Sequence, residues 1–111
     1  MNRHALAQMI DHTALKPETT WSDIDRLVAQ GLELGVYGVC VAPSFLPLDS
    51  RGLALVAVAG FPSGAHCPEV KAAEAARAAA DGATEVDMVM NLGRAKAAEW
   101  SLVGAEIAAV R

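Results

Sequence analysis

The chemistry that this sequence could perform centres on one acidic residue inside an apolar stretch. Residues 83–93 alternate like a strand, and the residues around Asp87 are apolar enough to predict burial on both faces of a sheet. A buried carboxylate without a partner is costly or stays protonated, so a chain keeps one mainly when it does chemistry or meets a cation. Two interpretations stay open: a functional acid, or a strand-end acid that caps a helix or pairs with Arg94.

Other polar residues lie at or just after the ends of further predicted strands. Asp11 and Thr13 are two residues apart in a short strand over residues 10–15, so their side chains project to the same side. Cys40 lies in a second strand, over residues 36–41, where a cysteine is more often a small buried hydrophobe than a nucleophile. Ser63 and Asn91 follow the third and fourth strands.

Several residues predict where the helices that position these side chains begin and end. Thr20 with Asp23 predicts a capping box, and Gly35 predicts the end of that helix. Pro68 predicts the start of the next helix, which ends near residue 81. The expected apolar faces are Val70, Ala73, Ala76 and Ala80 in that helix, and Trp100, Val103, Ile107 and Val110 in the last one.

Strands and helices therefore alternate, and the strand over residues 53–59 contains no polar residue. This order predicts an α/β fold with a parallel sheet, whose polar strand ends would lie on the catalytic face of a (β/α) barrel. Four strands cannot close a barrel of about eight strands, and an open flavodoxin-like sheet normally needs about five. We therefore expect about four βα units, half of a TIM-type barrel.

Composition excludes several classes of protein. The formal net charge of −4 argues against a nucleic-acid-binding surface. No apolar run approaches the ~20 residues of a membrane helix. Cys40 and Cys67 fit neither a metal site nor a disulfide framework, so we expect a cytoplasmic protein with reduced thiols.

Four motifs in register resemble the N-terminal half of the 2-deoxyribose-5-phosphate aldolase family. They are Asp11-His12-Thr13-Ala14-Leu15-Lys16-Pro17, Val39-Cys40-Val41-Ala42-Pro43-Ser44, Gly60-Phe61-Pro62-Ser63-Gly64 and Glu85-Val86-Asp87-Met88-Val89. The resemblance covers roughly residues 6 to 111 and implies that residues 1–111 are the N-terminal half of a single (β/α)8 aldolase barrel. It implies a class I aldolase without metal or cofactor that cleaves 2-deoxyribose 5-phosphate reversibly to glyceraldehyde 3-phosphate and acetaldehyde. A homodimer or another homo-oligomer is the expected assembly.

The resemblance assigns roles only where residues match. Asp87 corresponds to the family's proton-relay aspartate, Asp11 and Thr13 to polar residues at the substrate end of the first strand, and Cys40 to a pocket cysteine. The Schiff-base lysine, a second relay lysine and the phosphate-binding loops belong to later strands, which this sequence does not contain. We therefore expect the 111-residue chain to be inactive alone. The link over residues 48–53 is also shorter than the family's usual connection.

The three lysines of the chain do not suit the imine role. A Schiff-base lysine must lose its charge, whereas Lys71 lies beside acidic residues and Lys96 is expected in a wet loop. Lys16 is the best placed, but a solvated surface role is expected for all three. His12 is expected to pack or cap, and His66 to begin a helix.

Three hypotheses follow. The first is the aldolase, with this chain as one half of it. The second is a non-catalytic half-barrel that associates with itself or with a partner half. The third is a different barrel enzyme, such as a sugar-phosphate isomerase, against which the joint match of four motifs argues.

Overall fold

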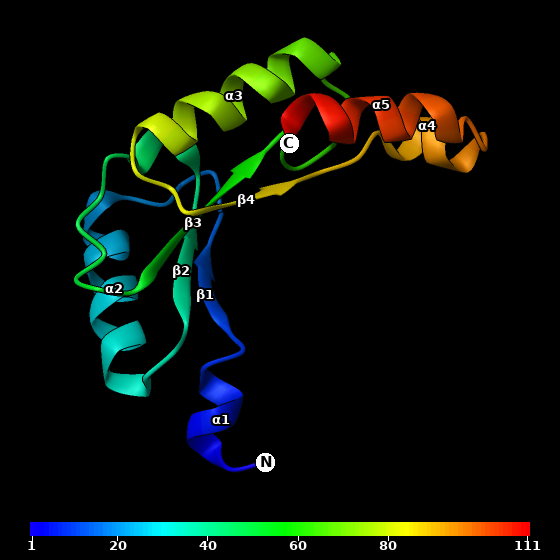
Figure 1. Cartoon of the computed structure of the whole chain (residues 1–111). Helices are drawn as coiled ribbons and strands as arrows, with labels where there is room; N and C mark the ends of the chain where they lie inside the picture. Colours follow the sequence, from blue (N-terminus) through cyan, green and yellow to red (C-terminus); the bar gives the residue numbers. More distant parts are fainter.

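A computed structural model describes all 111 residues and is built around one parallel sheet in the order β1-β2-β3-β4 (Figure 1). The strands are β1 (Asp11–Ala14), β2 (Gly38–Val41), β3 (Ala54–Ala59) and β4 (Glu85–Met88). The helices are α1 (Arg3–Ala7), α2 (Trp21–Leu34), α3 (Pro68–Ala80), α4 (Leu92–Lys96) and α5 (Trp100–Val110), and a 3₁₀ turn, η1 (Pro43–Phe45), follows β2. The predicted α/β class and the four parallel strands are confirmed.

Helix α2 begins and ends where the sequence predicts. The Thr20 hydroxyl accepts the Asp23 N–H, and the Asp23 carboxylate accepts the Thr20 N–H at 2.8 Å, which completes the capping box. Hydrogen bonds from the backbone N–H and the hydroxyl of Thr20 lower the pKa of Asp23. Gly35 ends the helix at φ +68°, a left-handed conformation that glycine adopts without strain.

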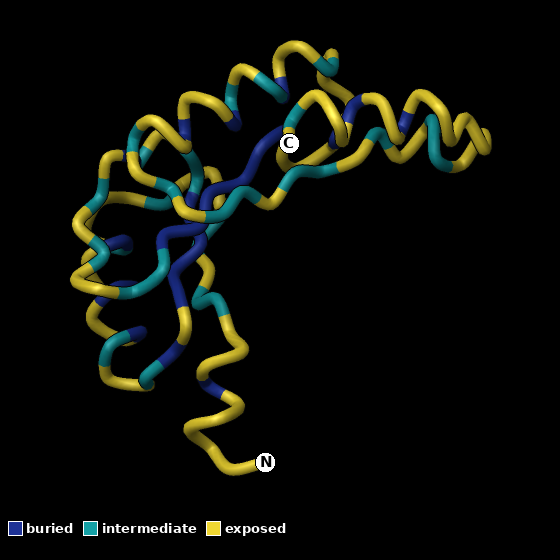
Figure 2. Tube along the Cα trace, viewed as in Figure 1, coloured by how far each residue is buried: buried dark blue, intermediate teal, exposed yellow.

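The core lies between the sheet and helices α2 and α3, and Figure 2 shows β2 and β3 as its most buried segments. Its buried apolar members are Ile24, Leu27, Val28, Val39, Val41, Leu46, Leu55, Ala57 and Ala78. They come from one face of β2 and β3, from α2 and α3, and from Leu46 after η1, and the partly buried Ala14 of β1 and Val86 of β4 pack against them. Apolar burial on this side therefore holds the domain together.

The other face of the sheet is not covered by a helix. Cys40, Val56 and Val58 form a small buried cluster on it, with Leu15 packed beside them. In Figure 1 this face looks toward the open space on the concave side of the molecule. Strands β1 and β4 each pair on one side only, so both edges of the sheet are free. The fold is half of a TIM-type barrel.

The predicted apolar face of α3 is wrong. Its buried residues are Lys71, Ala75 and Ala78, whereas Val70 is 54% exposed. Spacings of four and three residues place these three on one side of the helix, toward β3, β4 and α5. Because alanine fills so much of α3, an apolar stripe could be drawn along several of its sides, and the one predicted is not the one that packs.

The last helix is partly as predicted. Val103 is buried, but Trp100 and Ile107 are exposed, and the second buried residue of α5 is Glu106. The short helix α4 was not predicted, and it contains Lys96, which was expected in a loop. Between η1 and β3 the chain forms no α-helix. None of the helices is both long and apolar enough to cross a membrane.

Candidate active site

The strand register brings the predicted site residues onto one face of the sheet. Thr13 pairs with Cys40, Cys40 with Val56, and Val56 with Glu85, so one row of side chains crosses all four strands. Asp87, two residues after Glu85, projects on the same side as that row and lies beside Val58. Asp11 lies two residues before Thr13. The four predicted residues Asp11, Thr13, Cys40 and Asp87 therefore share the open face.

Asp87 itself is exposed, so the prediction of a buried carboxylate is wrong. The prediction assumed a strand covered on both faces, whereas nothing covers the inner face of β4. The alternative roles fail as well, because none of the three ion pairs of the chain includes Asp87, and Asn91 rather than Asp87 caps α4. Asp87 is left as an unpaired carboxylate on an open surface.

Asp11 is the more buried acid of the two. Burial raises its pKa, and the charges of Glu85 and Asp87 raise it further. Its Oδ1 atom is buried and has no hydrogen-bond partner. A Cβ atom at Gly38 would lie 2.9 Å from that oxygen, so the bare glycine on β2 gives Asp11 its room. Asp11 therefore keeps its proton to a higher pH than an ordinary aspartate does.

Cys40 lies in the centre of the row and is 3% exposed. Burial raises the pKa of its thiol to about 11, and the charges of Asp87 and Asp11 contribute, against a hydrogen bond with Thr13 that lowers it. A thiol in this state is protonated at neutral pH and is not a nucleophile. The prediction of a small buried hydrophobe is confirmed.

Sequence reasoning missed one polar pair on this face. The Tyr37 hydroxyl donates to Glu85 Oε1 at 2.8 Å, from the residue before β2 to the first residue of β4. That hydrogen bond raises the pKa of Tyr37, and the nearby charges of Glu85 and Asp11 add to the effect. The available signal was the two-residue spacing of Glu85 and Asp87, which puts both acids on one side of a strand.

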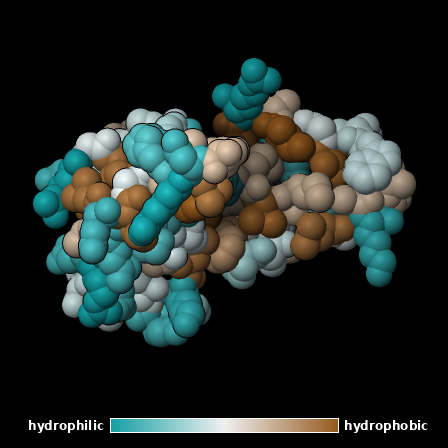
Figure 3. Space-filling model, turned by 90° about the horizontal axis from the view of Figure 1, so that it is seen from below, coloured by the Kyte–Doolittle hydropathy of each residue, from teal (hydrophilic) through white to brown (hydrophobic).

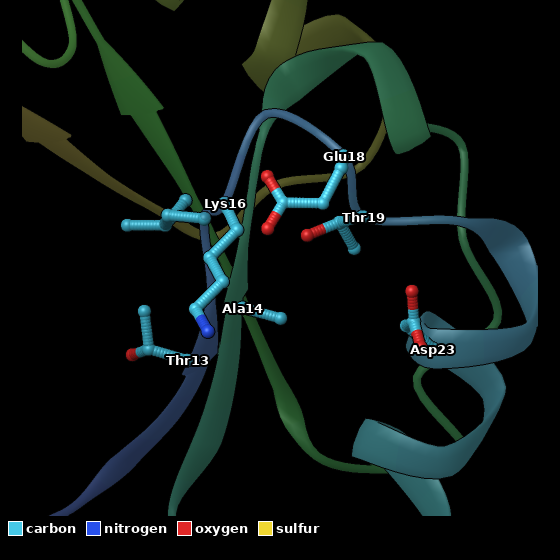
Figure 4. Close-up of a pocket in the computed structure, with 7 residues that line it drawn as sticks. Thr13, Ala14, Lys16, Glu18, Thr19 and Asp23 are labelled. Atoms are coloured by element: carbon cyan, nitrogen blue, oxygen red, sulfur yellow. The ribbon is translucent and has the colours of Figure 1, made fainter.

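A hollow opens at the carboxyl end of β1, between the strand, the following loop and the start of α2 (Figure 4). Its volume is about 420 Å³. The lining residues are Thr13, Ala14, Leu15, Lys16, Glu18, Thr19 and Asp23. In Figure 4 the Lys16 side chain runs back along β1 toward Thr13. The hollow thus adjoins the open face at its carboxyl end, the end that carries catalytic residues in (β/α) barrels.

The lysines differ from one another in placement. Lys16 and Lys96 are exposed, as expected. The predicted surface role of Lys71 is wrong, because its side chain is fully buried and pairs with Glu106 at 3.0 Å.

His12 lies on the helix side of β1, within 3.2 Å of the Gln30 side chain of α2, and His66 is exposed before α3. No group of three or more His, Cys, Asp or Glu side chains is arranged to hold a metal ion.

The chain has relatives among curated proteins and among solved structures, although no family model matches it. The deoxyribose-phosphate aldolase of Corynebacterium diphtheriae is 56% identical over 110 residues, which are 98% of this chain and 50% of that protein. Among solved structures, QR15, an aldolase, has a TM-score of 0.85 at 34% identity, covering 94% of this chain and 48% of the other. The deoxyribose phosphate aldolase of Aeropyrum pernix, whose structure is described as a unique tetramer, has a TM-score of 0.76 at 30% identity, covering 95% and 50%. The chain spans about half the length of the curated relatives it matches.

Proposed function

This chain is homologous, over nearly its whole length, to one half of the deoxyribose-phosphate aldolases, and we propose that residues 1–111 are the N-terminal half of such an aldolase. The proposed reaction is the reversible cleavage of 2-deoxyribose 5-phosphate to glyceraldehyde 3-phosphate and acetaldehyde through a lysine Schiff base. The observation that carries the proposal is the 56% identity that extends over 98% of the chain. On this proposal the other half supplies the imine lysine and binds the phosphate.

Asp87 is the proposed proton donor and acceptor. In an imine mechanism the acetaldehyde carbon loses a proton to form an enamine and later regains it. An exposed, unpaired carboxylate on the open face is free to exchange that proton, directly or through a water molecule. The direction of the Asp87 side chain, toward the side on which the missing strands would close a barrel, supports this role.

Asp11, Thr13 and Cys40 are the proposed substrate-contacting residues. Asp11, whose Oδ1 atom has no hydrogen-bond partner, would accept a hydrogen bond from a sugar hydroxyl. Thr13 is exposed at the rim of the hollow, where its hydroxyl now donates to the Asp11 carbonyl at 2.8 Å. Cys40 would form an uncharged, apolar floor. No metal or cofactor is part of the proposed reaction.

The proposed partners are the sugar phosphate and acetaldehyde as small molecules, and further copies of the complete enzyme. A homodimer or another homo-oligomer is proposed, and the relative from Aeropyrum pernix is described as tetrameric. We propose the cytoplasm as the site of action, because Cys40 and Cys67 are free thiols.

A second candidate is a non-catalytic half-barrel that associates with itself or with a partner half. The two unpaired sheet edges favour it, because exposed strands at β1 and β4 promote pairing with another chain. It differs from the aldolase in one testable respect: association would not create activity.

The test joins residues 1–111 to the half of the Corynebacterium diphtheriae protein that they do not match; we call this the completed protein. The completed protein should cleave 2-deoxyribose 5-phosphate. Asp87→Asn should then lower turnover by about 10²-fold or more, as expected for loss of a general acid or base. The matched control is Asp25→Asn, an exposed acid on α2 away from the open face. A folded completed protein without activity would refute the aldolase, and a few-fold effect of Asp87→Asn would remove Asp87 from the mechanism.

A further inference from the structure

One ion pair of this chain is buried, and it joins α3 to α5. Lys71 Nζ lies 3.0 Å from Glu106 Oε2, and both side chains are 0% exposed. The other two ion pairs are local: Arg26 pairs with Asp23 within α2, and the exposed Arg77 pairs with Asp81, the residue that follows α3. Removing two charges from water carries a large desolvation cost, so the position of this pair calls for an explanation.

The second carboxylate oxygen of Glu106 explains why a charged pair is kept at this buried position. Glu106 Oε1 accepts the backbone N–H of Asn91 at 2.6 Å. Burial raises the pKa of Glu106, but the Asn91 N–H and the Lys71 ammonium lower it by more, with a contribution from Arg94, so the pKa lies below its usual value. Glu106 is therefore a charged bridge between a helix cation and the backbone that follows β4.

Asn91 is the residue at which the chain turns from β4 into α4. Its side chain accepts the Arg94 N–H at 3.1 Å and so caps α4. Two residues earlier, the Val89 N–H donates to the Ala59 carbonyl at 2.9 Å, which continues the pairing of β4 with β3. The segment after β4 is thus held at Val89 by the sheet and at Asn91 by Glu106.

Helix α3 reaches the carboxyl ends of both neighbouring strands. Glu74 accepts the Gly60 N–H directly at 2.8 Å, immediately after β3. The stem of Lys71 packs on Gly60, where a Cβ atom would lie 3.0–3.1 Å from three of its carbons. Lys71 then reaches the end of β4 through Glu106, and Figure 1 shows α3 and α5 side by side above that end of the sheet.

We propose that Glu106 is a positioning residue that fixes the segment after β4, and with it the placement of Asp87 on the open face, and that Lys71 supplies the charge that lets the Glu106 carboxylate be buried. Packing alone does not account for the pair, since an apolar pair of similar volume is often as stable as a buried ion pair or more so. An apolar side chain at position 106, however, could not accept the Asn91 N–H. The catalytic consequence rests on the proposed aldolase function, whereas the anchoring of Asn91 rests on the contacts alone.

The experiment compares two double variants in the completed protein. Lys71→Met with Glu106→Leu removes the charges and the acceptor of the Asn91 N–H. Lys71→Met with Glu106→Gln removes the charges but keeps a carbonyl oxygen for that N–H. Arg77→Met is the matched control, because it removes an exposed cation from the same helix. The readouts are the melting temperature, amide hydrogen exchange at Asn91 and Val89, and kcat and KM.

Both double variants should fold, with melting temperatures near that of the parent. In the leucine variant the Asn91 amide should exchange at least about 10-fold faster while Val89 is unchanged. Its kcat should fall by about 10-fold or more with little change in KM, because a displaced catalytic group affects the chemical step. The glutamine variant and the Arg77→Met control should resemble the parent in both respects.

Equal Asn91 exchange and equal kcat in the two double variants would overturn the proposal, because both lose the charges and only one loses the acceptor. If the parent completed protein is folded but inactive, the aldolase function fails. In that case Asn91 exchange alone decides whether the pair anchors the segment.

Discussion

Alkylation of Cys40 gives a quantitative test of the electrostatics of the open face. The thiol is 3% exposed, and burial raises its pKa to about 11, with contributions from the charges of Asp87 and Asp11. The chain contains one other cysteine, Cys67, which is exposed before α3. Cys67 therefore serves as an internal reference for the reactivity of Cys40.

The expected magnitude follows from thiolate populations. At about pH 7.5 an ordinary thiol of pKa about 8.5 is roughly 9% ionised, whereas a thiol of pKa about 11 is ionised to only about 0.03%, a ratio of about 300. A more basic thiolate is also more nucleophilic. With a Brønsted coefficient of about 0.4, the higher basicity raises the rate constant of the Cys40 thiolate by about 10-fold and so offsets part of the roughly 300-fold difference in population. Ionisation alone thus predicts that Cys40 reacts about 30-fold more slowly than an ordinary thiol, and its burial adds to this.

The assay is timed labelling of the completed protein with iodoacetamide, read by mass spectrometry of the peptides that contain Cys40 and Cys67. Cys40 should react at least about 30-fold more slowly than a small-molecule thiol of pKa about 8.5. The exposed Cys67 should be labelled faster than the buried Cys40. Asp87→Asn should speed the labelling of Cys40, because it removes a negative charge that raises the pKa of the thiol. Asp25→Asn should not change the rate. Labelling of Cys40 as fast as that of Cys67, or indifference to Asp87→Asn, would refute the proposed electrostatic coupling across this face.

Two further predictions concern stability and association. Thr20→Ala should lower the melting temperature of the completed protein by a few degrees at neutral pH, because it removes the N-cap of α2. The Thr20 hydroxyl also donates to the Asp23 carboxylate and lowers its pKa, so this part of its contribution is full above the ordinary value of 3.8 and is lost as pH falls through the lowered value. The melting temperatures of parent and variant should therefore draw closer in acid without becoming equal, because the hydroxyl still accepts the Asp23 N–H there, and a gap that does not narrow would contradict the assignment. The isolated 111-residue chain should dimerise, aggregate or be partly molten, because β1 and β4 have free edges. Apolar side chains also gather on the arm formed by α4 and α5 (Figure 3), where Trp100 is 62% exposed. A well-folded monomer in sedimentation, with cooperative unfolding, would contradict this prediction.

The parts of the fold that sequence predicted are those that local chemistry determines. The start of α2 at Thr20 and its end at Gly35 follow from hydrogen bonds and backbone conformation within a few residues. Pro68 likewise begins α3. Period-two placement also put Asp11 and Thr13 correctly on one side of β1, which the strand register confirms.

The parts that failed depend on partners distant in sequence. Lys71 was expected in water because its nearest acids along the helix are Glu69 and Glu74, but its partner, Glu106, lies 35 residues further on. Local spacing cannot reveal that contact. The burial of Asp87 was also wrongly predicted, because it was inferred from apolar neighbours along the strand, whereas no element of the 111 residues covers the inner face of β4.

The most direct test of the central claim is reductive trapping with acetaldehyde and borohydride, mapped by mass spectrometry. In the completed protein a single stoichiometric adduct should form on a lysine of the added half. The 111-residue chain alone should form no specific adduct, because Lys16 and Lys96 are exposed surface lysines and Lys71 is buried in its pair with Glu106. A stoichiometric adduct on Lys16, Lys71 or Lys96 would contradict the account, because the chain would then contain its own nucleophile.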